Sequence, residues 1–196
     1  MWAKLEHTIF RFFAKLRVLY STNSLDNRVR RILVESLYQN PSSLAIGAFV
    51  GVTTSAVAAH DAHNHTINLI AAIVATVAIL RVIVAYALPY RKRGNVRMLE
   101  LMFEFGAFSY ALSLGVLAAA CIALNVPPVT QLMMLTAAVA YGAGISARNA
   151  GRLPIAIGQL LLAVSPACVV LISRPDITSR VLAVSMGLFV LAMISI

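Results

Sequence analysis

Three of the four histidines of the chain fall within six residues, between His60 and His65. Imidazole nitrogens together with a carboxylate can ligate zinc, copper or nickel, and a short loop can bring alternating side chains onto one ion. A histidine at the outer rim of a membrane domain can also ligate haem, and protonation of its ring can sense pH. His60, Asp61, His63 and His65 are therefore candidate ligands for a metal or a haem. Their spacing matches no known ligand motif, so we favour a plain wet loop between two apolar segments.

Three ionisable residues, Arg81, Glu100 and Glu104, lie inside long apolar runs. A charge there is costly in lipid and normally faces a partner or a cavity. The runs that hold Arg81 and Glu104 are antiparallel across a loop centred near Arg93, so the two residues lie at similar depths. They are predicted to form an ion pair that fixes helix register, in preference to a proton relay. Glu100 lies one helical turn nearer the loop, where Arg97 or headgroup water is within its reach.

The sequence holds no constellation typical of an intramembrane protease or a kinase. It has no serine and histidine pair, no paired aspartates in adjacent apolar runs and no glycine loop suited to phosphate. Cys121 and Cys168 lie in apolar runs, where a thiol behaves as a small hydrophobe. Gln159 is expected to hydrogen bond a neighbouring helix. We therefore expect no enzymatic activity from this chain alone.

Composition assigns these residues to a membrane protein. Of the 196 residues, 60% are hydrophobic and 12% charged, whereas soluble domains have roughly 25% charged residues. So many apolar residues do not fit inside one soluble core, and lipid is the first expected partner. The net charge of +9 would favour a nucleic-acid partner in a soluble chain, but the basic residues flank apolar runs and no aromatic residues interleave with them. We therefore expect no nucleic acid.

Six apolar runs approach the roughly 20 residues that a helix needs to cross a bilayer. They lie at about Ser42–Ala59, Ile67–Leu88, Met98–Leu124, Gln131–Ser146, Pro154–Ser173 and Arg180–Ile196. Glycine and serine recur in several runs, and small residues let membrane helices approach closely. The sequence therefore predicts an all-α polytopic membrane domain of six transmembrane helices over residues 42–196.

Residues 1–41 are predicted to form one or two amphipathic helices on the cytoplasmic side. Between Met1 and Tyr20, apolar residues recur at helical spacing with lysine and arginine between them. A second short helix is expected from about Asp26 to Gln39, before the break at Pro41.

The distribution of lysine and arginine predicts the orientation, because cytoplasmic loops keep the positive excess. Seven precede Pro41 and four lie between the second and third runs, whereas the first and third loops have none. The fourth loop adds Arg148 and Arg152, and the fifth has Arg174 and Arg180. Both termini are therefore expected in the cytoplasm, with the domain in a bacterial inner membrane.

Two short stretches resemble the multi-span sensor modules of bacterial cyclic-di-GMP signalling proteins, which are fused to GGDEF or EAL enzymes. One runs from Ala147 through Arg148, Asn149 and Arg152 and continues past Gln159 to Pro166, and the other is 34–41. The resemblance implies an N-terminal sensory or anchoring module, whose diguanylate cyclase or phosphodiesterase domain follows the sixth span. We expect this module to form a homodimer. The last run is short and lacks a basic flank, so we expect the chain to be cut before that domain.

The leading hypothesis is thus a membrane input domain that regulates a cyclic-di-GMP enzyme in cis, with a ligand that shifts the balance between two helix arrangements. The alternative is a stand-alone transporter or channel subunit with Arg81, Glu100 and Glu104 along a polar path. No internal repeat of the kind that transporters show is found. A membrane enzyme acting on lipid is a third hypothesis, without a catalytic constellation to support it.

Overall fold

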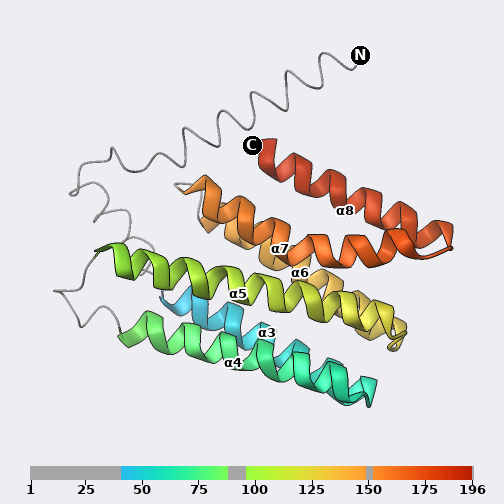
Figure 1. Cartoon of the computed structure of the whole chain (residues 1–196), viewed down its shortest axis with the longest axis horizontal. Helices are drawn as coiled ribbons and strands as arrows, with labels where there is room; N and C mark the ends of the chain where they lie inside the picture. Colours follow the sequence, from blue (N-terminus) through green and yellow to red (C-terminus); the bar gives the residue numbers. More distant parts are fainter. Residues whose placement is uncertain (1–40, 88–95, 149–151, 196) are drawn as a thin grey trace.

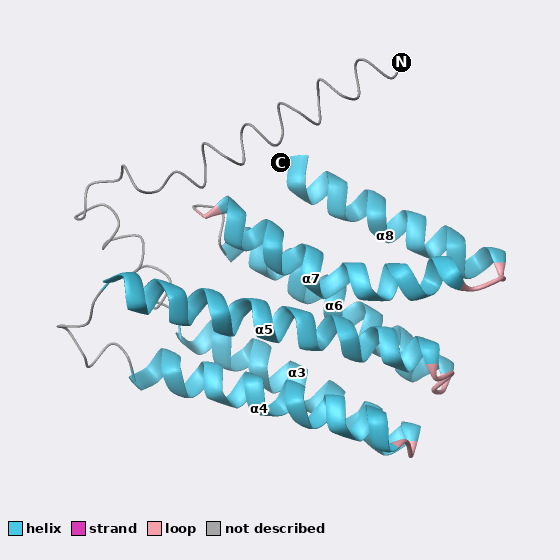
Figure 2. Ribbon diagram, viewed as in Figure 1, coloured by secondary structure: helices cyan, strands magenta, loops and turns pink. Residues whose placement is uncertain are grey.

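The computed structural model describes residues 41–87, 96–148 and 152–195, and these are helical throughout apart from short turns (Figure 2). The helices are α3 (Pro41–Ala62), α4 (His65–Ala87), α5 (Val96–Ala123), α6 (Pro128–Arg148), α7 (Leu153–Ser173) and α8 (Ile177–Ser195). All six are long and apolar enough to cross a membrane. The prediction of an all-α fold with six such helices is confirmed. The amphipathic helices predicted before Pro41 lie outside the described residues.

The helix boundaries follow local chemistry within a few residues of the predicted ones. Helix α6 begins at Pro128 and α7 has Pro154 in its first turn, where the missing N–H of proline costs nothing. Asn64 caps α4, since its side-chain oxygen accepts a hydrogen bond from the Thr66 backbone N–H at 2.8 Å. His63 and Asn125 have φ values of 45° and 54°, which let the chain turn after α3 and α5.

Helix α5 lies at the centre of the bundle (Figure 1). Its most extensive contact is with α7, and it also packs against α4 and α6. Helices α3 and α4 pair along one edge, whereas α8 packs on α7 at the other (Figure 1). One end of the bundle gathers the start of α3, the end of α4, the start of α5, the end of α6 and the start of α7 (Figure 1). We call it the basic end, because the sequence places the basic loops there.

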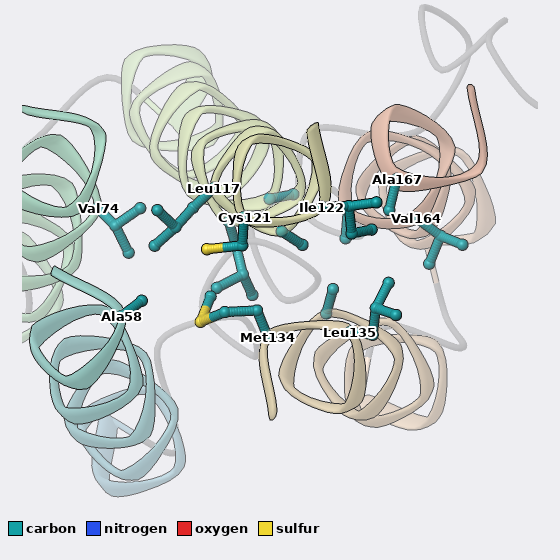
Figure 3. Packing of buried hydrophobic residues seen from close by; sticks show 14 of the residues in the cluster. Ala58, Val74, Leu117, Cys121, Ile122, Met134, Leu135, Val164 and Ala167 are labelled. Carbon is teal, nitrogen blue, oxygen red and sulfur yellow. The ribbon is translucent and has the colours of Figure 1, made fainter. Parts of the chain in front are cut away.

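The interior of the bundle is apolar, and all six helices contribute buried residues to it. Figure 3 shows Ala58, Val74, Leu117, Met134 and Val164 converging on one cluster. Large apolar side chains are equally common outside: Phe105 is 77% exposed and Phe49 is 70% exposed. An apolar shell around an apolar core is what a bilayer requires and what water would disfavour.

Helices α5 and α7 approach closely at Gly115. A Cβ on Gly115 would lie 2.5 Å from the carbonyl oxygen of Leu162 and 2.7 Å from that of Ala163. These neighbours are backbone atoms and cannot move aside as a flexible side chain would. The contact therefore requires glycine, and it sets the distance between the two most buried helices.

We predict that Gly115→Ala destabilises the bundle by about 1–3 kcal/mol, the usual cost of overpacking a closely packed core. Gly187→Ala on α8 is the matched control, because a Cβ there meets nothing within 4 Å. The control should be neutral or slightly stabilising, since alanine is the better helix former. Thermal unfolding of both variants in the same detergent measures the difference, and equal stabilities would contradict the close contact.

Candidate functional site

A cavity of about 300 Å³ lies between α3, α4, α5 and α6. Its floor includes Arg81 of α4 and Tyr110 and Leu114 of α5. Its walls come from residues at the start of α3 and near the end of α6. Ser43, Ile46 and Val50 on one wall, with Gly144 on the other, are exposed at the surface, so the cavity opens sideways between α3 and α6. This is the size of a small-ligand site.

Arg81 is the charged group of this cavity. Its Nη1 donates to the Tyr141 hydroxyl of α6 at 3.1 Å. Its guanidinium carbon lies 5.8 Å from the ring centre of Phe103 and 5.6 Å from that of Tyr110, within range of cation–π attraction. The Nε and Nη2 atoms are buried and have no hydrogen-bond partner among the described residues. The guanidinium is therefore held in place while two of its three nitrogen atoms make no hydrogen bond within the described part of the chain.

Tyr110 connects the cavity floor to α3. Its hydroxyl donates to the Gly47 carbonyl oxygen at 3.1 Å. A Cβ on Gly51, one turn further along α3, would lie 1.9 Å from that hydroxyl oxygen. Glycine at position 51 thus makes room for the buried phenol. Tyr110 also packs edge-to-face on Tyr141, with ring centres 5.0 Å apart.

Tyr141 carries the hydrogen-bond chain onward to α7. Its hydroxyl donates to Gln159 Oε1 at 2.7 Å while accepting from Arg81. Gln159 is fully buried, and its Nε2 donates to the Ile155 carbonyl oxygen at 3.3 Å. The role predicted for Gln159, a hydrogen bond to a neighbouring helix, agrees with this geometry. One chain of hydrogen bonds therefore runs from α4 through α6 to α7.

The buried ion pair of the described residues joins Glu100 and Arg152, which were expected as secondary polar residues. Arg152 Nη1 lies 2.5 Å from Glu100 Oε1, and both side chains are almost fully buried. The pair expected between Arg81 and Glu104 is not formed in the described part of the chain: Arg81 points across to α6, where Tyr141 accepts its hydrogen bond. Depth alone suggested Glu104, but depth does not determine which neighbouring helix a side chain faces.

The remaining residues of the predicted site lie at or beyond the ends of helices. Arg97 is exposed in the first turn of α5, and Glu104 is half-buried further along it. Asn149 and the side chain of Arg148 lie outside the described residues, so their predicted roles stay predictions.

In the histidine loop, residues 60–65, Asp61 contacts both Thr130 and His60. Asp61 Oδ2 accepts a 2.6 Å hydrogen bond from Thr130 of α6, and its Oδ1 lies 3.2 Å from His60 Nδ1. His63 makes the turn after α3, and His65 opens α4. Among the described residues no three histidine, cysteine or acidic side chains gather in a way that could hold a metal. The ligand role considered for His60, Asp61, His63 and His65, and the plain loop favoured over it, stay predictions.

Two tyrosines of the cavity are missing from the residues predicted above. Tyr110 and Tyr141 lie within apolar runs, away from the interfacial belt that tyrosine normally occupies. A phenol buried there needs a hydrogen-bond partner, and this requirement could have identified both. The spacing of Gly47 and Gly51, four residues apart, is the further signal, because it indicates a close approach to α3.

The turn after α7 is tied to the end of α5. Arg174 Nη2 donates to the Asn125 side-chain oxygen at 2.7 Å and to the Ile122 carbonyl oxygen. Asp176 caps α8, since its Oδ2 accepts from the Ser179 backbone N–H at 2.8 Å. Hydrogen bonds from the Ser179 side chain and then its backbone N–H lower the pKa of Asp176 below its usual 3.8.

We predict that removing one partner of the Glu100–Arg152 pair costs up to about 3–5 kcal/mol, because the remaining charge stays buried and loses this partner. Glu100→Leu and Arg152→Met should each destabilise the protein strongly. The double variant should recover most of the loss. Thermal unfolding of the four proteins completes the cycle, and additive effects of the two single changes would contradict a coupled pair.

The cap of α8 predicts a pH dependence. The lowered pKa of Asp176 means that its carboxylate stabilises the fold above pH 3.8, and this contribution is lost as pH falls further. Asp176→Ala should therefore lower the unfolding temperature at neutral pH, with the difference from wild type shrinking below pH 3.8. Asp176→Asn keeps a neutral cap, so at neutral pH it should lose less stability than Asp176→Ala and show a weaker pH dependence than wild type. A constant difference at every pH would contradict the cap.

No protein-family model matches the chain, and no curated protein or solved structure matches it either. The resemblance to cyclic-di-GMP sensor modules thus stays a prediction based on two short stretches of sequence. What the chain does has to be inferred from the cavity, its arginine and the hydrogen bonds that lead away from it.

Proposed function

We propose that this chain is a membrane-embedded input domain whose cavity controls the arrangement of its helices. The output in this proposal is a cyclic-di-GMP-metabolising enzyme joined in cis after α8, as the sequence resemblance implies. A ligand in the cavity favours one of two helix arrangements, and the enzyme responds to the shift. The domain acts in a bacterial inner membrane, with both termini in the cytoplasm.

The observation that carries the proposal is the hydrogen-bond chain from Arg81 through Tyr141 to Gln159. It starts in the cavity and ends inside α7, the helix on which α8 packs. A group that moves Arg81 also disturbs the hydrogen bonds of Tyr141, because the same hydroxyl accepts from Arg81 and donates to Gln159. In the proposal, a binding event at the cavity is therefore linked through α7 to α8, the helix that precedes the output.

The alternative, a transporter or channel, needs a polar path across the bundle. The cavity residues lie in the half of the bundle next to the basic end. The other half is filled by apolar side chains such as Leu117, Ile122 and Met134, all nearly or completely buried. Glu100 is paired with Arg152. An apolar half without a cavity residue such as Arg81, together with the pairing of Glu100, supports an input domain over a transport pathway.

Helix α8 supports the proposed homodimer. It packs mainly on α7 and leaves apolar side chains such as Val181, Leu188 and Leu191 exposed. In the proposal two copies of α8 carry the paired output domains. Association through α8 would also suit a module that only anchors and dimerises, so the test has to measure regulation.

The test is a chimera in which a diguanylate cyclase catalytic domain follows α8, assayed in membranes. We predict that Tyr141→Phe and Gln159→Leu, which break the hydrogen-bond chain, change the cyclase rate about fivefold or more, as is typical of allosteric coupling. Thr53→Val is the control, because Thr53 is exposed and bonds only carbonyl oxygens of its own helix. Unchanged rates in both variants would contradict regulation, and ion flux through proteoliposomes of the chain would favour transport.

A further inference from the structure

Two nitrogen atoms of the Arg81 guanidinium, Nε and Nη2, make no hydrogen bond with the described residues. A guanidinium carries five N–H donors and no acceptor. In this protein Nη1 is engaged by Tyr141, whereas Nε and Nη2 are buried without a hydrogen-bond partner among the described residues. These two nitrogens lie on one edge of the guanidinium plane, the edge that takes two oxygens of a carboxylate or phosphate at once. The unused edge therefore suits an anion with paired oxygens.

The rings around Arg81 hold the cation in place without neutralising it. Phe103 and Tyr110 lie within 6 Å of the guanidinium and provide cation–π attraction. Glu100, a buried carboxylate on the neighbouring helix α5, pairs with Arg152. Among the described residues, the printed contacts of the Arg81 guanidinium are two rings and a hydroxyl. A positive group in a membrane domain with such surroundings is costly unless an anion joins it.

Arg81 lies below one end of its helix, close enough for a lipid headgroup to reach it. It lies six residues before Ala87, the last residue of α4, which is roughly 9 Å along the axis at 1.5 Å per residue. The helix end belongs to the basic end of the bundle. An anion bound to Arg81 thus lies just inside the bilayer surface, where lipid phosphates are the abundant anions.

The rest of the cavity is apolar and opens at the outer surface of the bundle, where the bilayer would lie. Ile46 is 66% exposed and Val50 is 47% exposed on the α3 side of the opening. Gly144 is exposed on the α6 side, and a Cβ there meets nothing within 4 Å. A small soluble anion would leave these apolar walls uncovered, whereas a hydrocarbon chain covers them.

We propose that the cavity binds an anionic phospholipid from the adjacent leaflet. Its phosphate pairs with the guanidinium of Arg81, which turns within the cavity to bring the buried Nε and Nη2 to the phosphate oxygens. One acyl chain leaves through the opening between α3 and α6. The proposal deepens the function proposed above and rests on it for its regulatory meaning. Lipid binding itself is a property of the chain and can be measured without any output domain.

The test uses the full chain, delipidated in detergent and titrated with phosphatidylglycerol, with lipid binding counted by native mass spectrometry. We expect one tightly bound phosphatidylglycerol per chain and weaker binding of phosphatidylcholine with the same acyl chains. Arg81→Gln should weaken phosphatidylglycerol binding by about tenfold or more, the loss expected on removing charge-assisted hydrogen bonds. Arg180→Gln removes an equal charge at the opposite end of the bundle and should leave binding unchanged.

A second variant keeps the arginine and blocks the opening. Gly144→Leu should also lose tight binding, whereas Gly187→Leu on α8 should not, and circular dichroism and gel filtration check that all variants fold. Equal binding of both lipids, or undiminished binding by folded Arg81→Gln or Gly144→Leu, would overturn the proposal. Displacement of the lipid by millimolar glycerol phosphate would assign the site to a soluble anion and overturn the lipid as ligand.

The binding assay and the cyclase assay fail separately. Lipid binding that depends on Arg81, in a chimera whose rate ignores lipid composition, would refute regulation and leave the lipid site standing. A rate that responds to Tyr141→Phe in a chain that binds no phosphatidylglycerol would refute the lipid and leave regulation standing.

Discussion

A guanidinium among apolar helices has to be satisfied by its neighbours, because water does not reach it there. Arg81 meets part of this requirement with a tyrosine hydroxyl and two aromatic rings. Directly or through these residues, the contacts connect α4 to α3, α5, α6 and α7. Tyr110 brings in the backbone of α3, and Tyr141 brings in Gln159 of α7. Arg81, Tyr110 and Tyr141 all line the cavity.

The helices that position this site are fixed by two contacts between α5 and the α7 segment. At Gly115 the absence of a side chain lets α5 touch the backbone of α7. At the basic end the Glu100–Arg152 pair joins the start of α5 to the residue before α7. A close packing contact and a polar one thus restrain the same pair of helices at two levels. The arrangement leaves α3 and α6 as the walls that can part, since they meet each other less extensively than α5 meets α7.

The sequence predicts the helices well and their partners poorly. The thickness of the bilayer sets how long an apolar run must be, and basic residues flank the runs. Six helices could therefore be predicted within a few residues of their boundaries. The pairing of Arg81 could not be read in the same way, because it depends on which helix α4 faces across the cavity. Glu104 lies at the same depth as Arg81, but Tyr141 lies on the helix that the Arg81 side chain faces. The contacts of the histidine loop could not be predicted either, since Asp61 accepts from Thr130 of another helix and Asn64 caps α4.

The central claim is that the free edge of Arg81 faces a lipid phosphate. Solid-state NMR of the arginine-labelled chain in phosphatidylglycerol bilayers measures this contact through dipolar coupling between guanidinium nitrogen and lipid phosphorus. The account predicts a coupled guanidinium signal that is present in wild type and missing in Arg81→Lys. A spectrum in which the signal assigned to Arg81 by this difference shows no coupling to phosphorus would contradict it.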